Sequence, residues 1–370
     1  MDFALGEELE AVRGLAQEIF QDRATAERLR AVEASATRVD AELWADLAGS
    51  GLLGIALPEE YGGAGLPLGA LCVLLETQGR TVAPVPLWSA SVAALAVAAH
   101  GTPAQRAALL PSAVDGSERL TLALEEFGPA DPLAPGTTAT ADGAGWRLTG
   151  TKAVVPSPNG ASHVLVSAQT EAGTGLFLVA ADAAGMVWTP AETTSLDLSA
   201  HLALAHVPAE AVGAPGRSGA VEWVVERAST ALAALQLGVG AGALRLAADY
   251  LSERQQFGRP LATFQAVQHQ LADCYIDLEA MRVTMWQAVE ALEHQPGAAR
   301  EALVAKWWAT EAGLNVVHRT QHLHGGIGVD TDYPVHRHFL WGRQLATTLG
   351  GAGADLSRLG ALLAAGAVSR

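Results

Sequence analysis

The stretch Arg254-Gln-Gln-Phe257-Gly258-Arg-Pro-Leu261, with Phe264-Gln265 just after it, decides the fold of this 370-residue chain. Arg254 carries a cation with forked donors, which suits a pyrophosphate group. Phe257 offers an apolar face to a bound ligand. Gly258 allows the backbone to approach that ligand closely, because glycine has no Cβ. Taken alone, the stretch leaves two interpretations open: a contact with a phosphate-containing ligand, or a surface pair of an Arg and a Phe at a helix end.

A second segment with the same properties is His324-Gly325-Gly326-Ile-Gly328, followed by Tyr333-Pro334 and His336-Arg337. Its adjacent glycines again permit a close backbone approach. Two weaker motifs precede it in the chain: a loop that runs from Trp44 through Leu52 and Pro58 to Gly65, and the hairpin sequence Trp146-Arg-Leu-Thr-Gly150-Thr-Lys152.

In this order and spacing, the four segments resemble the acyl-CoA dehydrogenase family over essentially the whole chain. The resemblance implies bound FAD, with residues that reach across a subunit interface to a cofactor held mainly by the neighbour. The cofactor-binding residues that it implies are Arg254, Gln256, Phe257, Gly258, Gln265, His322, Gly325 and Gly326.

The chain divides by pattern into three parts of an α+β fold. Residues 1–112 have helical periodicity, residues 113–217 have short β-favouring runs, and residues 218–370 return to helix. The resemblance implies an N-terminal helical domain, a central β-barrel domain and a C-terminal four-helix bundle. The bundle contains a stripe at steps of three and four residues, formed by Val267, Leu271, Cys274, Leu278, Met281, Met285, Val289 and Leu292.

The pattern also predicts individual elements. Pro103 and Pro111 are expected to mark the end of the first helical part. Helices are expected near 41–49, 68–80, 89–100, 298–322 and 333–365, the last with a break near Gly350. Strands are expected at 119–124, 146–149, 163–167, 176–180, 186–189 and 201–207.

Composition limits the possible partners and compartment. Lys and Arg number 23 and Asp and Glu 39, so the net charge of −16 disfavours nucleic acids and anionic membranes. Cys72 and Cys274 are predicted to be buried in helices, which fits a reducing cytoplasm. The acidic N-terminus is unlike a signal peptide, and the apolar run from Ala228 to Leu244 is too short and too weakly apolar for a membrane span.

The chemistry of the family is α,β-dehydrogenation of an acyl-CoA, in which a Glu removes the Cα proton and a hydride passes to the flavin. In many members this Glu lies in a turn that aligns here with Thr348 to Gly353, and its position falls on Gly350. A minority of members place the base on the helix before Arg254, at the position of Ala228 here. Glu226 lies two residues away and is the remaining candidate for a catalytic base, although a two-residue step rotates a helical position by about 200°.

The flavin-ring half of the site also departs from the family. The family's T-E-P-x-x-G-S-D segment aligns with Leu124 to Asp131, and its W-I-T-N segment with Ala153 to Gly160. The usual Gln before Gly-Gly is His322, and the Thr that touches the flavin is Ala352. The pyrophosphate half is therefore intact while the half around the flavin ring is eroded.

This asymmetry resembles one subunit of actinobacterial heterotetrameric (α2β2) steroid side-chain acyl-CoA dehydrogenases, in which a homologous partner carries the base. It implies an acyl-CoA substrate and an electron-transfer flavoprotein as the acceptor. Two alternatives stay open: a self-sufficient homo-oligomer that uses Glu226, and a flavin monooxygenase or scaffold with the same fold. No metal is expected, because His318 and His322 have no carboxylate or Cys ligand beside them.

Overall fold

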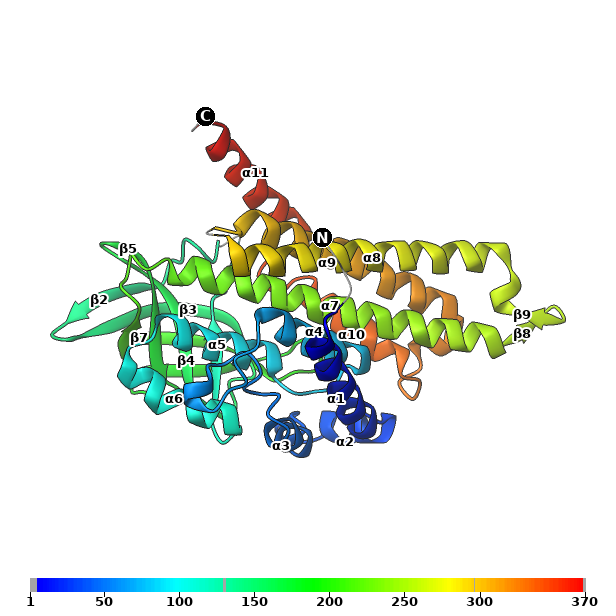
Figure 1. The fold of residues 1–370 in the computed structure, drawn as a ribbon, viewed down its shortest axis with the longest axis horizontal. Coiled ribbons are helices and arrows are strands. Elements are labelled where there is room, and N and C mark those ends of the chain that lie inside the picture. The colour runs from blue at the N-terminus through cyan, green and yellow to red at the C-terminus, as the bar shows by residue number, and fades with distance from the viewer. Residues whose placement is uncertain (1–4, 129–130, 296, 369–370) are drawn as a thin grey trace. The chain divides into compact units, whose positions relative to one another are not determined.

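The computed structural model describes residues 5–128, 131–295 and 297–368 (Figure 1). The chain forms two compact units that interleave along the sequence. The bundle unit comprises Met1–Leu29, Cys72–Ala83 and Ser229–Arg370, and the sheet unit comprises Arg30–Leu71 and Pro84–Ala228. Helix α7 (Ala220–Glu253) begins in the sheet unit and continues into the bundle unit.

The sheet unit is built on seven strands. They are β1 (Arg119–Ala123), β2 (Thr138–Asp142), β3 (Gly145–Pro156), β4 (Ala161–Thr170), β5 (Gly173–Ala180), β6 (Met186–Ala191) and β7 (Ser199–Val212). The strands pair in the order β1-β4-β2-β3-β7-β5, and β5 also pairs with β4. That last pairing closes a ring of strands around a core that includes Leu148, Val164, Phe177 and Leu202. A barrel follows from this closure.

Short helices of the same unit precede the strands: α3 (Ala41–Gly49), the 3-10 turn η1 (Glu59–Tyr61), α5 (Leu87–His100) and α6 (Pro103–Asp115). Asp40 caps α3 by accepting a hydrogen bond from the Leu43 N–H. Thr102 and Gln105 form a capping box at the start of α6, with Pro103 in the first turn. Pro103 therefore begins a helix, and Pro111 lies inside it, so the prediction that both residues end the helical part was wrong.

The bundle unit contains long helices. They are α1 (Glu7–Arg23), most of α4 (Leu68–Thr81), the larger part of α7, α8 (Gln265–His294), α9 (Ala299–His324), α10 (Val335–Leu345) and α11 (Ala352–Val368); α2 (Ala26–Glu33) begins in this unit. The six central and C-terminal members of the predicted α8 stripe, from Cys274 to Leu292, are buried. The amphipathic pattern therefore oriented α8 correctly.

The predicted order of a helical part, a sheet part and a second helical part is confirmed, while its boundaries at 112 and 217 stay predictions. Strand β2 was not predicted. Helix α7 is long and apolar enough to cross a membrane by length and composition alone, but 72% of its most apolar window is buried inside the protein. Such burial is typical of the core helix of a bundle.

Candidate functional site

The stretch from Arg254 to Leu261 forms a hairpin at the end of α7 (Figure 1). Gln255–Gln256 (β8) pairs with Arg259–Pro260 (β9), and the Leu261 N–H donates to the Arg254 carbonyl at 2.8 Å. The two turn residues both have positive φ, 54° at Phe257 and 77° at Gly258. That sign pattern belongs to the two-residue turns that match the twist of a hairpin. The ring of Phe257 is consequently held out in solvent, with 90% of the residue exposed.

The hairpin is joined to the start of α8 by its aromatic residues. Phe257 makes an edge-on contact with Phe264, at 6.1 Å between centroids. The Arg259 guanidinium lies 4.1 Å from the centroid of the Phe264 ring. Gln265 begins α8 directly after Phe264 and is exposed. These contacts give the hairpin a fixed direction although few backbone hydrogen bonds hold it.

The second glycine segment ends α9. Gly325–Val329 forms the 3-10 turn η3, and Gly325 has φ 63°. A Cβ added at Gly325 or at Gly326 would meet no atom of this chain within 4 Å. Backbone conformation explains the glycine at 325, whereas neither conformation nor packing within the chain explains Gly326. His322, in the last turn of α9, is exposed.

An aromatic cluster connects these two segments. Tyr250 stacks on His324 at 5.0 Å, and Tyr333 packs against Tyr250 at 6.0 Å and His324 at 5.2 Å. The cluster joins the end of α7, four residues before Arg254, to the turn at Gly325. No role was predicted for these three side chains, although His324 directly precedes the predicted Gly325 and Tyr250 lies one helical turn before Arg254.

The predicted cofactor residues fit a pyrophosphate ligand by their chemistry. Arg254, Gln256 and Gln265 are exposed donors on one joined structure, and the glycines leave open space where a side chain would stand. A forked cation with nearby backbone is a familiar phosphate-binding arrangement. Their role as FAD contacts stays a prediction.

The position predicted for the usual base is a turn without a carboxylate. Gly350 has φ 98°, and its carbonyl accepts a hydrogen bond from Lys306 Nζ at 3.3 Å. Ala352 begins α11. Neither side chain can take up a proton, so this turn of the chain supplies no base.

Glu226, the alternative base, lies in the second turn of α7. Its carboxylate is 4.0 Å from the Arg227 guanidinium, and its side chain is 16% exposed. Arg227 in turn lies over the Trp223 ring at 3.8 Å. The carboxylate is thus part of a polar group at the beginning of the helix, and its role as a base stays a prediction.

The segment that aligns with T-E-P-x-x-G-S-D contributes Glu126 to a partly buried ion pair; residues 129–130 of that segment lie outside the described residues. Lys152 Nζ donates to Glu126 Oε1 at 2.8 Å and to Ser167 Oγ at 3.0 Å. Glu126 also accepts from the N–H groups of Gly136 and Thr137. Burial would raise the pKa of Glu126, but the bonds from Lys152 and Thr137 lower it to about 2.

The segment that aligns with W-I-T-N is irregular. Val154 and Ser157 have φ 47° and 42°, which is unusual for residues other than glycine and especially for a β-branched one. The Val154 N–H donates to His201 Nδ1 at 3.2 Å, and the ring of Phe127 lies 4.8 Å from the His201 ring. Phe127, 60% exposed, lies in the segment that aligns with T-E-P-x-x-G-S-D.

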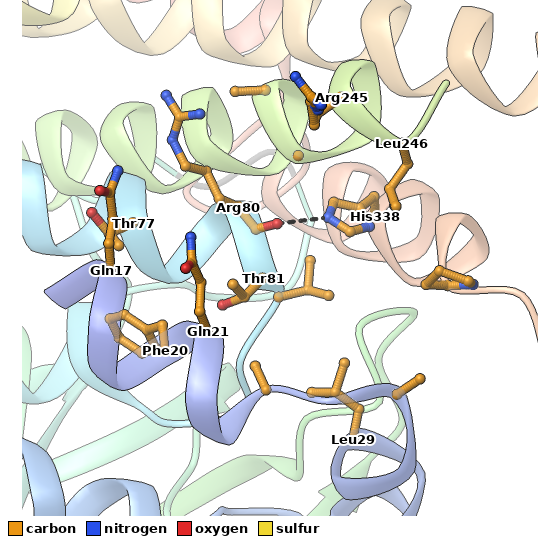
Figure 2. Close-up of a pocket in the computed structure, with 16 residues that line it drawn as sticks. Gln17, Phe20, Gln21, Leu29, Thr77, Arg80, Thr81, Arg245, Leu246 and His338 are labelled. Carbon is orange, nitrogen blue, oxygen red and sulfur yellow. Dashed lines mark hydrogen bonds between the residues drawn. The ribbon is translucent and has the colours of Figure 1, made fainter. Parts of the chain in front are cut away.

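A separate cavity of about 440 Å³ lies in the bundle unit between α1, α4, α7 and α10 (Figure 2). Its wall is mainly apolar and includes Phe20, Leu29 and Leu246. His338 donates a hydrogen bond from Nε2 to the Arg80 carbonyl at 3.0 Å, and burial lowers the pKa of His338 to about 4. None of the predicted site residues lines this cavity.

Other reactive groups give no competing site. Among the described residues, no three His, Cys, Asp or Glu side chains lie close enough to hold a metal ion. Cys72 and Cys274 are reduced and buried, as predicted. Burial raises the pKa of both thiols, that of Cys274 to about 11, so neither is a nucleophile at neutral pH.

Comparisons with known proteins agree on one family. The model of the acyl-CoA dehydrogenase N-terminal domain matches residues 6–117, and that of the C-terminal domain matches residues 220–356. Acyl-CoA dehydrogenase FadE27 of Mycobacterium tuberculosis is 38% identical over 98% of this chain and 99% of its own length.

Two solved structures are similar over nearly the whole chain. One is described as a variant of the Tcur3481-Tcur3483 steroid ACAD, with 65% identity, a TM-score of 0.96 and coverage of 99% of this chain and 100% of that one. The other is the ChsE4-ChsE5 complex from Mycobacterium tuberculosis, with 37% identity, a TM-score of 0.93 and coverage of 98% and 99%. The chain therefore belongs to the acyl-CoA dehydrogenase family, whose members are FAD-dependent oxidoreductases that act on CH–CH bonds.

Proposed function

We propose that this chain is the complementary subunit of a heteromeric acyl-CoA dehydrogenase. It provides pyrophosphate contacts to FAD across an interface, and a homologous partner carries the catalytic base. The complex is an α2β2 heterotetramer in the cytoplasm. Similarity to the ChsE4-ChsE5 complex, and to a steroid ACAD whose description joins two names, supports this arrangement.

The observation that carries the proposal is an exposed cofactor-type hairpin in a chain whose base position is glycine. Arg254 and Phe257 point out from the chain that bears them, while Gly350 has no proton acceptor. A hairpin that faces outward serves a ligand held by another subunit better than one held in its own interior.

The reaction requires removal of a proton from Cα and of a hydride from Cβ. FAD, when bound, accepts the hydride. Arg254 would neutralise charge on the pyrophosphate through its forked donors, and Phe257 would cover the adenosine end. These residues position the cofactor, and proton removal belongs to a carboxylate of the partner.

The substrate class we propose is an acyl-CoA with a steroid side chain. Its support is the description of the 65% identical structure as a steroid ACAD. The electrons would leave the complex through an electron-transfer flavoprotein, the usual acceptor that the family resemblance implies.

Measuring flavin content tests the proposal. The chain is purified alone and together with a homologous dehydrogenase subunit, and bound FAD and dehydrogenation of a steroid side-chain acyl-CoA are measured. We expect little FAD and no turnover from the lone chain, and both from the pair. Full FAD loading with turnover by the lone chain would refute the proposal.

A substitution separates the self-sufficient alternative from this result. If the lone chain turns over and Glu226→Gln abolishes that turnover, Glu226 is the base and the chain is a homo-oligomeric enzyme. In the complementary-subunit proposal, Glu226→Gln leaves the turnover of the pair within about twofold of the parent.

A further inference from the structure

The turn that replaces the base is strained, and its leucine is buried. Leu349 has φ 59° and Gly350 has φ 98°, and Leu349 is only 3% exposed. A left-handed conformation is unfavourable for leucine because its Cβ crowds the backbone carbonyl oxygen. Contacts from outside the turn must therefore hold it in this shape.

Two cations provide those contacts. The Arg358 guanidinium donates from Nη2 to the Leu349 carbonyl at 2.6 Å. Lys306 Nζ donates to the Gly350 carbonyl at 3.3 Å and to Thr310 Oγ1 at 2.8 Å. Both left-handed residues thus have their carbonyl groups bound to a positive charge.

A buried carboxylate balances the two cations. Asp355 Oδ2 lies 3.7 Å from Lys306 Nζ, and Asp355 Oδ1 lies 3.6 Å from Arg358 Nη2. The Asp355 side chain has no exposed surface; burial raises its pKa, and the two cations oppose that rise. Asp355 is sealed from any substrate, so it does not replace the missing base.

The guanidinium also occupies the space beside Gly350. A Cβ built at Gly350 would lie 2.6 Å from Arg358 Nη2 and 3.2 Å from Ala354 Cβ. A side chain at position 350 would therefore require the end of the Arg358 side chain to move away from the turn.

We propose that the Arg358 side chain fills the space beside residue 350. This subunit therefore lacks a base for two reasons: residue 350 is glycine, and Arg358 takes the place that a side chain acting as the base would need. The proposal rests on the proposed function, since it explains why this subunit leaves the chemistry to its partner. Lys306 and Asp355 are positioning residues that keep Arg358 in place.

One consequence concerns any acid introduced at this position. A carboxylate at residue 350 would pair with Arg358 and Lys306, and cations at that distance favour its ionised form. A carboxylate held in this way binds a proton too weakly to act as a general base. Restoring Glu at 350 without removing Arg358 should therefore not restore a base.

A cysteine probe tests the charge at the turn in the full chain. In Gly350→Cys, the thiolate is titrated by its absorbance near 240 nm; the buried Cys72 and Cys274 do not interfere, because their thiols ionise only at high pH. We expect the pKa of the new thiol to lie at least about one unit below the ordinary 8.5, and to return towards 8.5 in Gly350→Cys/Arg358→Gln. An ordinary or raised pKa that Arg358→Gln leaves unchanged would overturn the proposal.

A double-mutant cycle tests the occupied space. Gly350→Ala should raise the unfolding equilibrium constant about tenfold more in the parent than in the Arg358→Gln background. Gly297→Ala is the matched control, because Gly297 has φ 76° and open space around it, and its effect should be the same in both backgrounds. Equal effects of Gly350→Ala in the two backgrounds contradict the proposal.

Failure to fold is also informative. Substitutions at Gly350 that fold only with Arg358→Gln support the proposal, whereas failure in both backgrounds assigns the cost to the backbone and refutes it. None of these measurements involves a partner, so their failure is distinct from failure of the proposed function, which the lone chain's FAD content and turnover decide.

Discussion

The hairpin at Arg254 and the turn before α11 use the same backbone arrangement in opposite environments. Each contains a bulky residue followed by glycine, both with positive φ: Phe257-Gly258 at 54° and 77°, and Leu349-Gly350 at 59° and 98°. Phe257 is 90% exposed, whereas Leu349 is 3% exposed. Arg254 is exposed beside the first turn, and Arg358 is bonded to the second.

The difference lies in what each arginine is available to bind. At the hairpin the cation and the aromatic ring are exposed, and we propose that they bind a ligand of another subunit. At the turn the Arg358 cation binds the Leu349 carbonyl and faces Asp355. Substitutions at the two turns should therefore affect different properties: FAD retention at the exposed hairpin, and stability at the turn before α11.

The largest expected effect is the loss of stability on removing the counter-charge of the closed turn. Asp355→Ala removes the acid that faces the buried Lys306 and the partly buried Arg358, and breaking one partner of a buried pair typically costs about 3–5 kcal/mol. Urea denaturation followed by circular dichroism measures the change in the free energy of unfolding.

The matched control is Asp249→Ala. Asp249 pairs with Arg245 on α7, with side chains 52% and 77% exposed, and such exposed pairs contribute about 1 kcal/mol or less. A loss at Asp355 no greater than that at Asp249 would mean that the cluster does not hold the turn.

This cluster also marks a limit of what the sequence could predict. Helix α8 was predictable because its buried residues recur at the helical period. The stretch at Arg254 was predicted as a ligand contact from its residue types, but its hairpin was not predicted. Lys306 and Asp355 lie 49 residues apart on two helices, and only tertiary packing brings them within 3.7 Å. Each interrupts an apolar pattern, which is a weak signal of a buried charge without an indication of its partner.

Two other differences between the prediction and the structure, at β2 and at Pro103, have local causes. Strand β2 has the sequence Thr-Ala-Thr-Ala-Asp and lacks large apolar residues; it exists because it pairs with β3 over five residues. Pro103 was taken as a breaker, but proline suits the first turn of a helix, where its missing N–H has no partner in any case. In both places the outcome depended on position within an element and not on residue type.

The second prediction concerns the stability of the protein at acid pH, which we expect to depend on the buried His338 of the bundle unit. The folded pKa of His338 is about 4, below its ordinary value of 6.5, because burial disfavours the charged ring. The unfolded chain therefore takes up the proton first, and stability is complete above pH 6.5 and is lost as the pH falls to about 4. The shift corresponds to about 3 kcal/mol.

His338→Gln should flatten the fall in unfolding free energy between pH 6.5 and 4. The exposed His294, substituted in the same way, should leave the slope as it is in the parent. Identical slopes for the parent and His338→Gln would show that another group dominates acid unfolding.

The third prediction concerns the open hairpin. Arg254→Ala should weaken FAD retention by the two-subunit complex about 10- to 100-fold, because a hydrogen bond between charged groups contributes about 1.5–3 kcal/mol. FAD released on dilution is measured by its fluorescence. Stability of the lone chain should stay within about 0.5 kcal/mol of the parent, since Arg254 is exposed.

Arg245→Ala removes an exposed arginine from the same helix and serves as the control for charge alone. Equal FAD loss from the two variants would indicate a general electrostatic effect instead of a pyrophosphate contact.

The smallest expected effect comes from placing asparagine at the left-handed position of each turn, Phe257 or Leu349. Asparagine tolerates a left-handed backbone better than phenylalanine or leucine, so Phe257→Asn should raise the unfolding free energy by up to about 1 kcal/mol while weakening FAD retention by the complex several-fold. Leu349→Asn gains the same backbone relief but buries an amide in place of a packed side chain, so it should lower stability. Thermal denaturation of the two variants decides the matter: a change of the same sign at both turns would mean that exposure does not govern how this chain uses its left-handed residues.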